Sequence, residues 1–172
     1  HKDTSYYLML AASERGHQVF HVTQQELSYE RPSLLGGGRW VQTHAEITRP
    51  FSLLEEGRQD LGSFDLVVVR SDPPFDRRYF YTTLLLDLIA SAVPVINRPS
   101  GLRDWNEKLS ALFFPQFTPP TLVSAELAQI EEFARQQGPV VIKPIDGHGG
   151  RGVIFLKSGQ ADFAEQVSGL TQ

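Results

Sequence analysis

Apolar and polar residues alternate along the first half of the chain in the pattern of a sheet with connecting helices. A helix is predicted over 6–15, because polar residues 3–5 can cap its start and Gly16 can end it. The alternating stretch 18–22 predicts a strand. A helix followed directly by a strand indicates a βαβ unit whose first strand is absent.

The clearest strand signal lies in the middle of the chain. Residues 66–69 are wholly apolar, which is typical of a central parallel strand. An amphipathic helix is predicted over 77–91 and a second strand over 93–97, which implies a βαβ crossover. The stripe of that helix expected to face the core consists of Leu84, Leu85, Leu88 and Ile89.

Two segments carry weaker patterns. The run Gly36-Gly37-Gly38 predicts a turn, with a strand over 40–47 on its far side. After Pro99, a helix is expected over 102–114. Its core-facing residues would be Leu109, Leu112 and Phe113.

A second domain is predicted after prolines 115, 119 and 120, which indicate a hinge or linker. A strand over 121–123, a helix over 125–137, a hairpin and a helix over 161–167 follow. The expected fold class is α/β, with domains 1–107 and 108–172.

The hairpin carries the candidate chemistry. Strands are predicted over 140–143 and 153–156, and they flank the loop Gly147-His148-Gly149-Gly150-Arg151-Gly152. Glycines let the backbone approach a ligand, and successive exposed N–H groups form a concave anion site. Lys143 adds a charge suited to phosphate. A glycine-rich turn without a ligand is the alternative interpretation, and it explains neither lysine nor arginine.

The loop matches neither of two common nucleotide motifs. No glycine-lysine-Ser/Thr triplet follows the glycines, as a Walker A sequence requires. A strand follows the loop where a dinucleotide-binding fold would begin a helix. A phosphate-binding loop that is carried by a β-sheet and closes over the phosphates is therefore favoured.

The chain carries a net charge of −4, which gives no general attraction to nucleic acid or to an anionic membrane. It contains no cysteine, so disulfides, thiolate zinc sites and cysteine nucleophiles are excluded. The longest apolar runs are too short to span a bilayer, and no secretory signal is visible. We expect a cytoplasmic protein without nucleic-acid or membrane partners, and we expect a homo-oligomer.

Four polar positions outside the loop are considered as candidates for function. Arg70 lies at the end of a predicted strand, and its planar guanidinium can make a two-point contact with a ligand carboxylate. Asp72 and Asp76 follow it, and the alternative for them is a rigid connector in which Asp76 caps the next helix. Lys108, taken alone, is typical of a solvated surface lysine.

Three motifs resemble the bacterial glutathione synthetases, a family of ATP-grasp ligases. They are RSDPPFD at 70–76, NRPSGLRDWNEKL at 97–109 and IKPIDGHGG at 142–150. The resemblance runs over nearly the whole chain in the same order. It implies a pre-ATP-grasp parallel-sheet domain followed by the partial N-terminal lobe of an ATP-grasp domain.

The resemblance also implies an activity and a set of site residues. ATP would phosphorylate the carboxylate of γ-glutamylcysteine, and glycine would attack the acyl phosphate. Arg70 would contact the dipeptide, and no residue of the chain is expected to act as a catalytic nucleophile. The residues expected to hold the ATP phosphates are Lys108, Lys143, Gly147, Gly149, Gly150, Arg151 and Gly152.

The chain departs from the family pattern at both ends. The first strand and the half that supplies Mg²⁺ ligands are absent, and Asp146 is the only carboxylate of the loop. These residues alone are therefore expected not to catalyse ligation. The rival hypotheses are another ATP-grasp carboxylate–amine ligase, a non-catalytic nucleotide-binding module and a purely structural domain.

Overall fold

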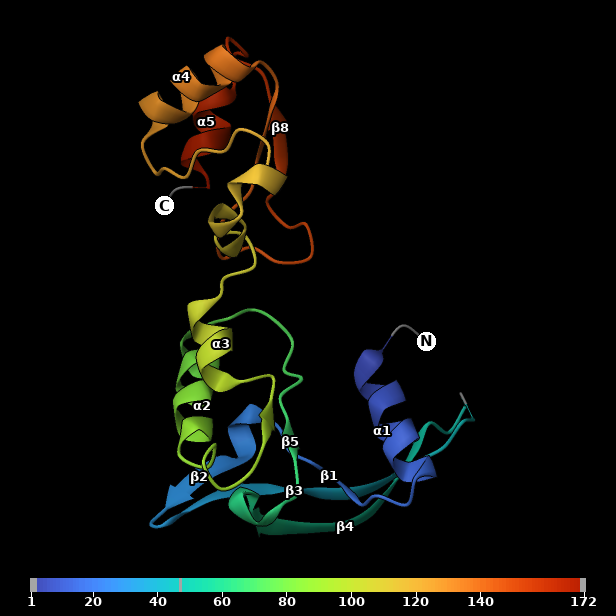
Figure 1. Ribbon diagram of the computed structural model, residues 1–172. Coiled ribbons are helices and arrows are strands. Elements are labelled where there is room, and N and C mark those ends of the chain that lie inside the picture. Colours follow the sequence, from blue (N-terminus) through green and yellow to red (C-terminus); the bar gives the residue numbers. More distant parts are fainter. Residues whose placement is uncertain (1–2, 47, 171–172) are drawn as a thin grey trace. The chain divides into compact units, whose positions relative to one another are not determined.

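The computed structural model describes residues 3–46 and 48–170, and the chain divides into two compact units (Figure 1). Unit 1 is His1–Asp104 and unit 2 is Trp105–Gln172. Both units combine helices with strands, and the mixed α/β class is confirmed.

An antiparallel sheet forms the base of unit 1. The strands are β1 (Val19–His21), β2 (Leu27–Glu30), β3 (Ser33–Thr43) and β4 (Phe51–Asp60). The long β3 pairs with β1 and β2 along one edge and with β4 along the other. Helix α1 (Thr4–Glu14) precedes β1 and is capped by the Asp3 carboxylate, as predicted. Strand β1 pairs with β3 in the antiparallel sense, and the βαβ unit predicted from α1 and β1 stays a prediction, because its first strand was expected outside this chain.

The glycine run lies inside β3, so the predicted turn at Gly36-Gly37-Gly38 is wrong. A Cβ on Gly38 would collide with the His21 carbonyl, and one on Gly36 would lie 3.0 Å from Val22 Cγ2. The glycines therefore let the neighbouring chain lie close to β3. Of the strand predicted over 40–47, residues 40–43 belong to β3, and Ile47 lies outside the described residues.

A second, parallel pair of strands completes unit 1. Strand β5 (Val67–Val68) pairs with β6 (Val95–Ile96), in the order expected for a crossover through α2 (Arg77–Asp87). Helix α3 (Pro99–Asp104) lies beside α2 (Figure 1). Short 3₁₀ turns, η1 (Gln24–Glu26) and η2 (Leu61–Ser63), join the remaining elements. The buried core contains Leu34, Leu61, Val69, Leu86, Ile89 and Val93.

The predicted stripe of α2 is only partly right. Ile89 is buried, but Leu84 and Leu88 are 42% and 54% exposed. The helical residues that face the core are Tyr79, Thr82, Thr83 and Leu86. The Thr83 hydroxyl donates to the Phe80 carbonyl, so a polar residue can occupy the buried face.

Unit 2 is built on a hairpin of β7 (Val140–Ile142) and β8 (Ile154–Leu156). Helices α4 (Leu127–Gln137) and α5 (Phe163–Ser168) pack together against it (Figure 1). Its core consists of Ile130, Ala134, Leu156, Phe163 and Val167. The strand and helix positions predicted for the hairpin, for α4 and for α5 are confirmed to within a few residues.

The segment between α3 and α4 differs from the prediction. The helix expected over 102–114 is absent; α3 ends at Asp104, and 3₁₀ turns η3 (Ser110–Phe113) and η4 (Pro115–Phe117) follow. Leu112 and Phe113 do not face a core, because they are 43% and 72% exposed. Residues 121–123 form no strand. No helix among the described residues has the length and apolar character needed to cross a membrane.

Candidate functional site

The glycine loop of unit 2 connects β7 to β8 through three tight turns. The Gly147 N–H donates to the Pro144 carbonyl at 3.3 Å, and the Arg151 N–H donates to the His148 carbonyl at 3.0 Å. The Val153 N–H then donates to the Gly150 carbonyl at 3.3 Å. Strand β7 ends at Ile142, so Lys143 lies just outside the strand in which it was predicted.

Three of the four glycines have backbone angles that other residues rarely adopt. The φ angles of Gly149, Gly150 and Gly152 are +58°, +77° and +71°. A Cβ on Gly152 would lie 2.8 Å from Pro144 Cγ, whereas one on Gly149 would meet no atom within 4 Å. The loop is therefore closely packed near Pro144 and open to solvent at its tip, where a ligand could approach the backbone.

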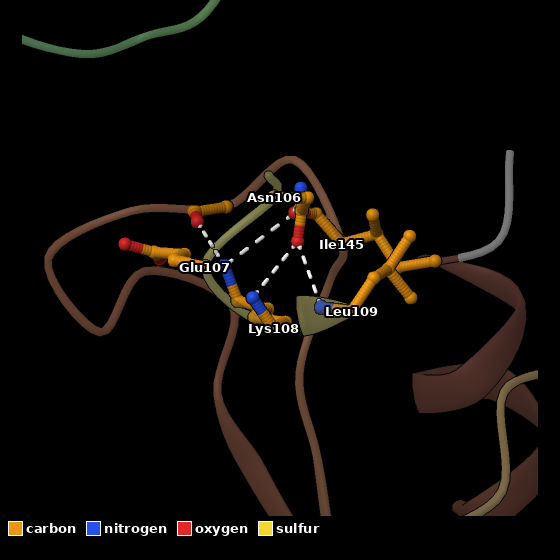
Figure 2. Close-up of polar contacts among 6 residues, drawn as sticks. Asn106, Glu107, Lys108, Leu109 and Ile145 are labelled. Atoms are coloured by element: carbon orange, nitrogen blue, oxygen red, sulfur yellow. Dashed lines mark hydrogen bonds and ion pairs between the residues drawn. The ribbon is translucent and has the colours of Figure 1, made fainter. Parts of the chain in front are cut away.

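Lys108 lies against this loop. Its ammonium donates to the Gly147 carbonyl at 2.5 Å and reaches the Ile145 carbonyl at 3.5 Å. The same ammonium forms an ion pair with the Glu107 carboxylate at 2.9 Å (Figure 2). The Lys108 side chain is only 21% exposed, so the interpretation as a solvated surface lysine is wrong.

Asn106 ties the Lys108 segment to the loop through both ends of its carboxamide. Asn106 Oδ1 accepts the N–H groups of Lys108 and Leu109 at 2.8 and 3.1 Å. Asn106 Nδ2 donates to the Ile145 carbonyl at 3.1 Å (Figure 2). Sequence reasoning assigned no role to this residue. Its one local signal was an asparagine two residues before a lysine, the spacing at which a side chain can cap a turn.

The other charged residues of the loop are exposed. The side chains of Lys143 and Arg151 form no hydrogen bond or ion pair with the residues that the structure describes. Their charges are thus free to meet an anion from solvent. Of the predicted phosphate residues, the described contacts bring Lys108 and Gly147 together and leave Lys143 without a partner in this part of the chain.

Arg70 belongs to unit 1, where it follows the buried Val69 and is exposed. Burial raises the pKa of the nearby Tyr79 phenol, the charge of Arg70 lowers it, and the charge of Asp72 raises it. These three side chains are therefore within electrostatic reach of one another. Asp76 Oδ1 accepts the Tyr79 N–H at 2.8 Å, which confirms the capping interpretation of Asp76.

The residues described here do not fit a metal site. No three His, Cys, Asp or Glu side chains gather in residues 3–46 and 48–170 in a way that could hold an ion.

The described geometry is that of a hairpin whose loop contains three positive-φ glycines and has a lysine at its side, a class of site that suits anions. Two family models match the same chain. Residues 1–103 match the N-terminal domain of prokaryotic glutathione synthetase, and residues 107–172 match its ATP-grasp domain. The chain belongs to the prokaryotic glutathione synthetase family.

Curated relatives support the same assignment. The glutathione synthetase of Pseudomonas syringae pv. tomato is 39% identical over 171 residues, which is 99% of this chain and 54% of the relative. That of Shewanella oneidensis is 33% identical over 172 residues, 99% of this chain and 55% of the relative. That of Coxiella burnetii is 37% identical over 157 residues, 91% of this chain and 49% of the relative. The chain thus spans about half the length of the curated relatives it matches.

Proposed function

We propose that this chain is part of an ATP-dependent ligase that joins γ-glutamylcysteine to glycine. The observation that carries the proposal is the contact of the Lys108 ammonium with the Gly147 carbonyl, at the edge of a loop rich in positive-φ glycines. Family membership and the glutathione synthetase names of the relatives support the choice of reaction.

The proposed phosphate site lies in unit 2. The backbone around Gly147, Gly149, Gly150 and Gly152 would face the phosphate oxygens, as in other backbone anion sites. The donors would be the N–H groups of Gly149, Gly150 and Gly152, because the Gly147 N–H already donates to the Pro144 carbonyl. Lys108, Lys143 and Arg151 would supply positive charge. These assignments are proposals, and so is the domain boundary at 107/108. The unit division at 104/105 and the family-model limits at 103 and 107 support a boundary at this place.

The proposed reaction needs no protein nucleophile. A carboxylate oxygen of γ-glutamylcysteine attacks the γ-phosphorus of ATP, and ADP leaves. The glycine amine then attacks the acyl phosphate carbon, the amide C–N bond forms, and phosphate leaves as the amine loses a proton. The protein contributes positioning and neutralisation of charge. In this scheme Lys108 and Lys143 neutralise the charge of the transferring phosphoryl group.

Arg70 is proposed to bind a carboxylate of the dipeptide. It lies after the end of β5, and its guanidinium is exposed and suited to a two-point contact with a carboxylate. ATP would bring Mg²⁺ to the reaction, and no residue of this chain is assigned to the ion. We further propose a cytoplasmic homo-oligomer that binds neither nucleic acid nor membranes.

An assay of the complete protein tests the reaction. ADP release should depend on γ-glutamylcysteine and glycine together, and the product should have the mass of glutathione. A panel of other acids and amines serves as the comparison. Preference for another pair would indicate a different ATP-grasp ligase, and nucleotide binding without turnover would indicate a binding module.

Lys143→Ala tests the phosphate role within this assay. We expect kcat/KM for ATP to fall about tenfold or more, since a hydrogen bond to a charged group contributes roughly 1.5–3 kcal/mol. Lys157→Ala, which removes an exposed lysine after β8, is the matched control. Unaltered ligation by the Lys143→Ala protein would contradict the assignment. The segment 1–172 alone should show no ligation, and turnover by it would refute that part of the account.

A further inference from the structure

We propose that Asn106 is a positioning residue that holds Lys108 against the glycine loop. This inference rests on the proposed phosphate role of Lys108 and extends it to a residue that touches no ligand itself. The carboxamide acts as a bridge: its oxygen fixes the backbone that carries Lys108, and its nitrogen fixes the backbone that leads into the loop (Figure 2).

The oxygen end of the bridge fixes the turn at Lys108. Asn106 Oδ1 accepts two successive N–H groups, those of Lys108 and Leu109, at 2.8 and 3.1 Å. The Ser110 N–H also donates to the Asn106 carbonyl at 2.9 Å. An asparagine that accepts N–H groups two and three residues ahead imposes a tight turn. The Lys108 Cα is thereby held in one place.

The nitrogen end of the bridge fixes the loop. Asn106 Nδ2 and Lys108 Nζ both point to the Ile145 carbonyl, at 3.1 and 3.5 Å. The Lys108 ammonium also donates to the Gly147 carbonyl, which lies two residues after Ile145. Ile145 and Gly147 are far from Asn106 in sequence, so these contacts join two separate stretches of unit 2 (Figure 2).

The arrangement matters because a lysine side chain is flexible. A long side chain loses rotamer freedom when it binds, and a fixed Cα with two carbonyl contacts removes part of that loss before a ligand arrives. Without the bridge, only the contacts of the flexible Lys108 ammonium would join the Lys108 turn to the loop. The Lys108 ammonium would then spend less time beside the loop, and phosphate affinity would fall.

Two substitutions separate the ends of the bridge. Asn106→Ser keeps an oxygen that caps turns well but is too short to reach the Ile145 carbonyl. Asn106→Ala removes both ends. Gln116→Ser is the matched control, because Gln116 is exposed and its side chain forms no hydrogen bond with described residues. Lys108→Met removes the ammonium whose position is at issue.

The test is a double-mutant cycle in the complete protein, with the dissociation constant of a non-hydrolysable ATP analogue measured by calorimetry. Asn106→Ser should weaken binding about fivefold, the effect of one hydrogen bond, and Asn106→Ala should weaken it more. In the Lys108→Met background, Asn106→Ser should change binding less than about twofold, since the residue acts through Lys108. The KM for ATP should rise while the KM for the dipeptide stays unchanged. The control should bind as the unsubstituted protein does.

The outcomes distinguish the inference from the function on which it rests. Wild-type affinity in Lys108→Met would refute the phosphate role of Lys108 itself. Weakened binding in Lys108→Met with wild-type binding in Asn106→Ser would overturn the positioning role alone. Equal losses from Asn106→Ser in both backgrounds would also overturn it, because they would show an effect that does not pass through Lys108.

Discussion

Replacing Gly152 with alanine tests how the glycine loop is packed. The residue has a φ of +71°, and an added Cβ would lie 2.8 Å from Pro144 Cγ and 3.3 Å from Pro144 Cδ. Pro144 is a ring closed onto its own backbone, so it cannot rotate out of the way. The methyl group must therefore displace the backbone of one side of the loop.

Two contributions set the loss of stability expected for Gly152→Ala. A left-handed backbone conformation costs a residue with a Cβ roughly 1–2 kcal/mol. Overpacking by one methyl group adds about 1–3 kcal/mol. Gly149→Ala is the matched control, because its φ is +58° but nothing lies within 4 Å of the added Cβ. Gly152→Ala should thus destabilise the hairpin by about 2–5 kcal/mol and Gly149→Ala by about 1–2 kcal/mol.

Amide hydrogen exchange is the suitable assay. The chain has two units, and a single unfolding midpoint would mix them. Exchange at the β7 and β8 amides reports the opening of the hairpin itself. Equal loss of protection in both variants, or a greater loss in Gly149→Ala, would refute the close packing of Gly152 against Pro144.

Three further substitutions follow from the fold. Gly38→Ala should destabilise the sheet of unit 1 by about 1–3 kcal/mol, measured by amide exchange at β3, whereas Gly37→Ala, whose nearest contact is 3.7 Å, should cost less. Leu156→Ala, at a residue 1% exposed, should lower the stability of unit 2 by about 2–5 kcal/mol, and unchanged exchange at β8 would contradict its core role. Hydrogen bonds from the Ser33 hydroxyl and a backbone N–H hold the pKa of Asp60 below its ordinary 3.8. Stability from Asp60 should therefore be present above about pH 4 and lost as the pH falls through the lowered pKa; Asp60→Asn should flatten this part of an acid titration.

Local sequence rules predicted the elements whose causes are local. Asp3 and Asp76 cap their helices because a carboxylate can reach the first free N–H groups from the adjoining residues. The hairpin of β7 and β8 was predicted because two apolar runs flank a glycine-rich stretch. Gly138 ends α4, where its φ of +86° is open to glycine alone among common residues.

Contacts between distant residues explain the errors. Nothing near Gly38 in sequence reveals that the His21 carbonyl will lie against it. The glycine run was therefore predicted as a turn, although it belongs to a strand. In α2, Thr82 and Thr83 occupy the buried face, and the choice of leucines over threonines wrongly assigned Leu84 and Leu88 to it. The helix predicted through Asn106 failed because that side chain caps a new turn instead.

The candidate site also combines features that follow from local sequence with features that depend on distant contacts. The residue types and order of the motifs nominated Lys108 and the glycines as phosphate ligands, and that role stays a prediction. The bridge of Asn106 could not be foreseen, because the Ile145 carbonyl lies 39 positions further along the chain. Glu107 could either pair with a neighbouring charge or cap a helix. The sequence does not decide between these two roles, and the structure shows the ion pair with Lys108.

The central claim is that Lys108, Lys143 and the glycine loop bind the phosphates of ATP. The most direct measurement compares the affinities of ATP and adenosine for the complete protein and for its Lys108→Met and Lys143→Met variants. The account predicts that each variant binds adenosine as the unsubstituted protein does and loses about tenfold or more of its affinity for ATP. Variants that keep the full preference for ATP over adenosine would contradict it.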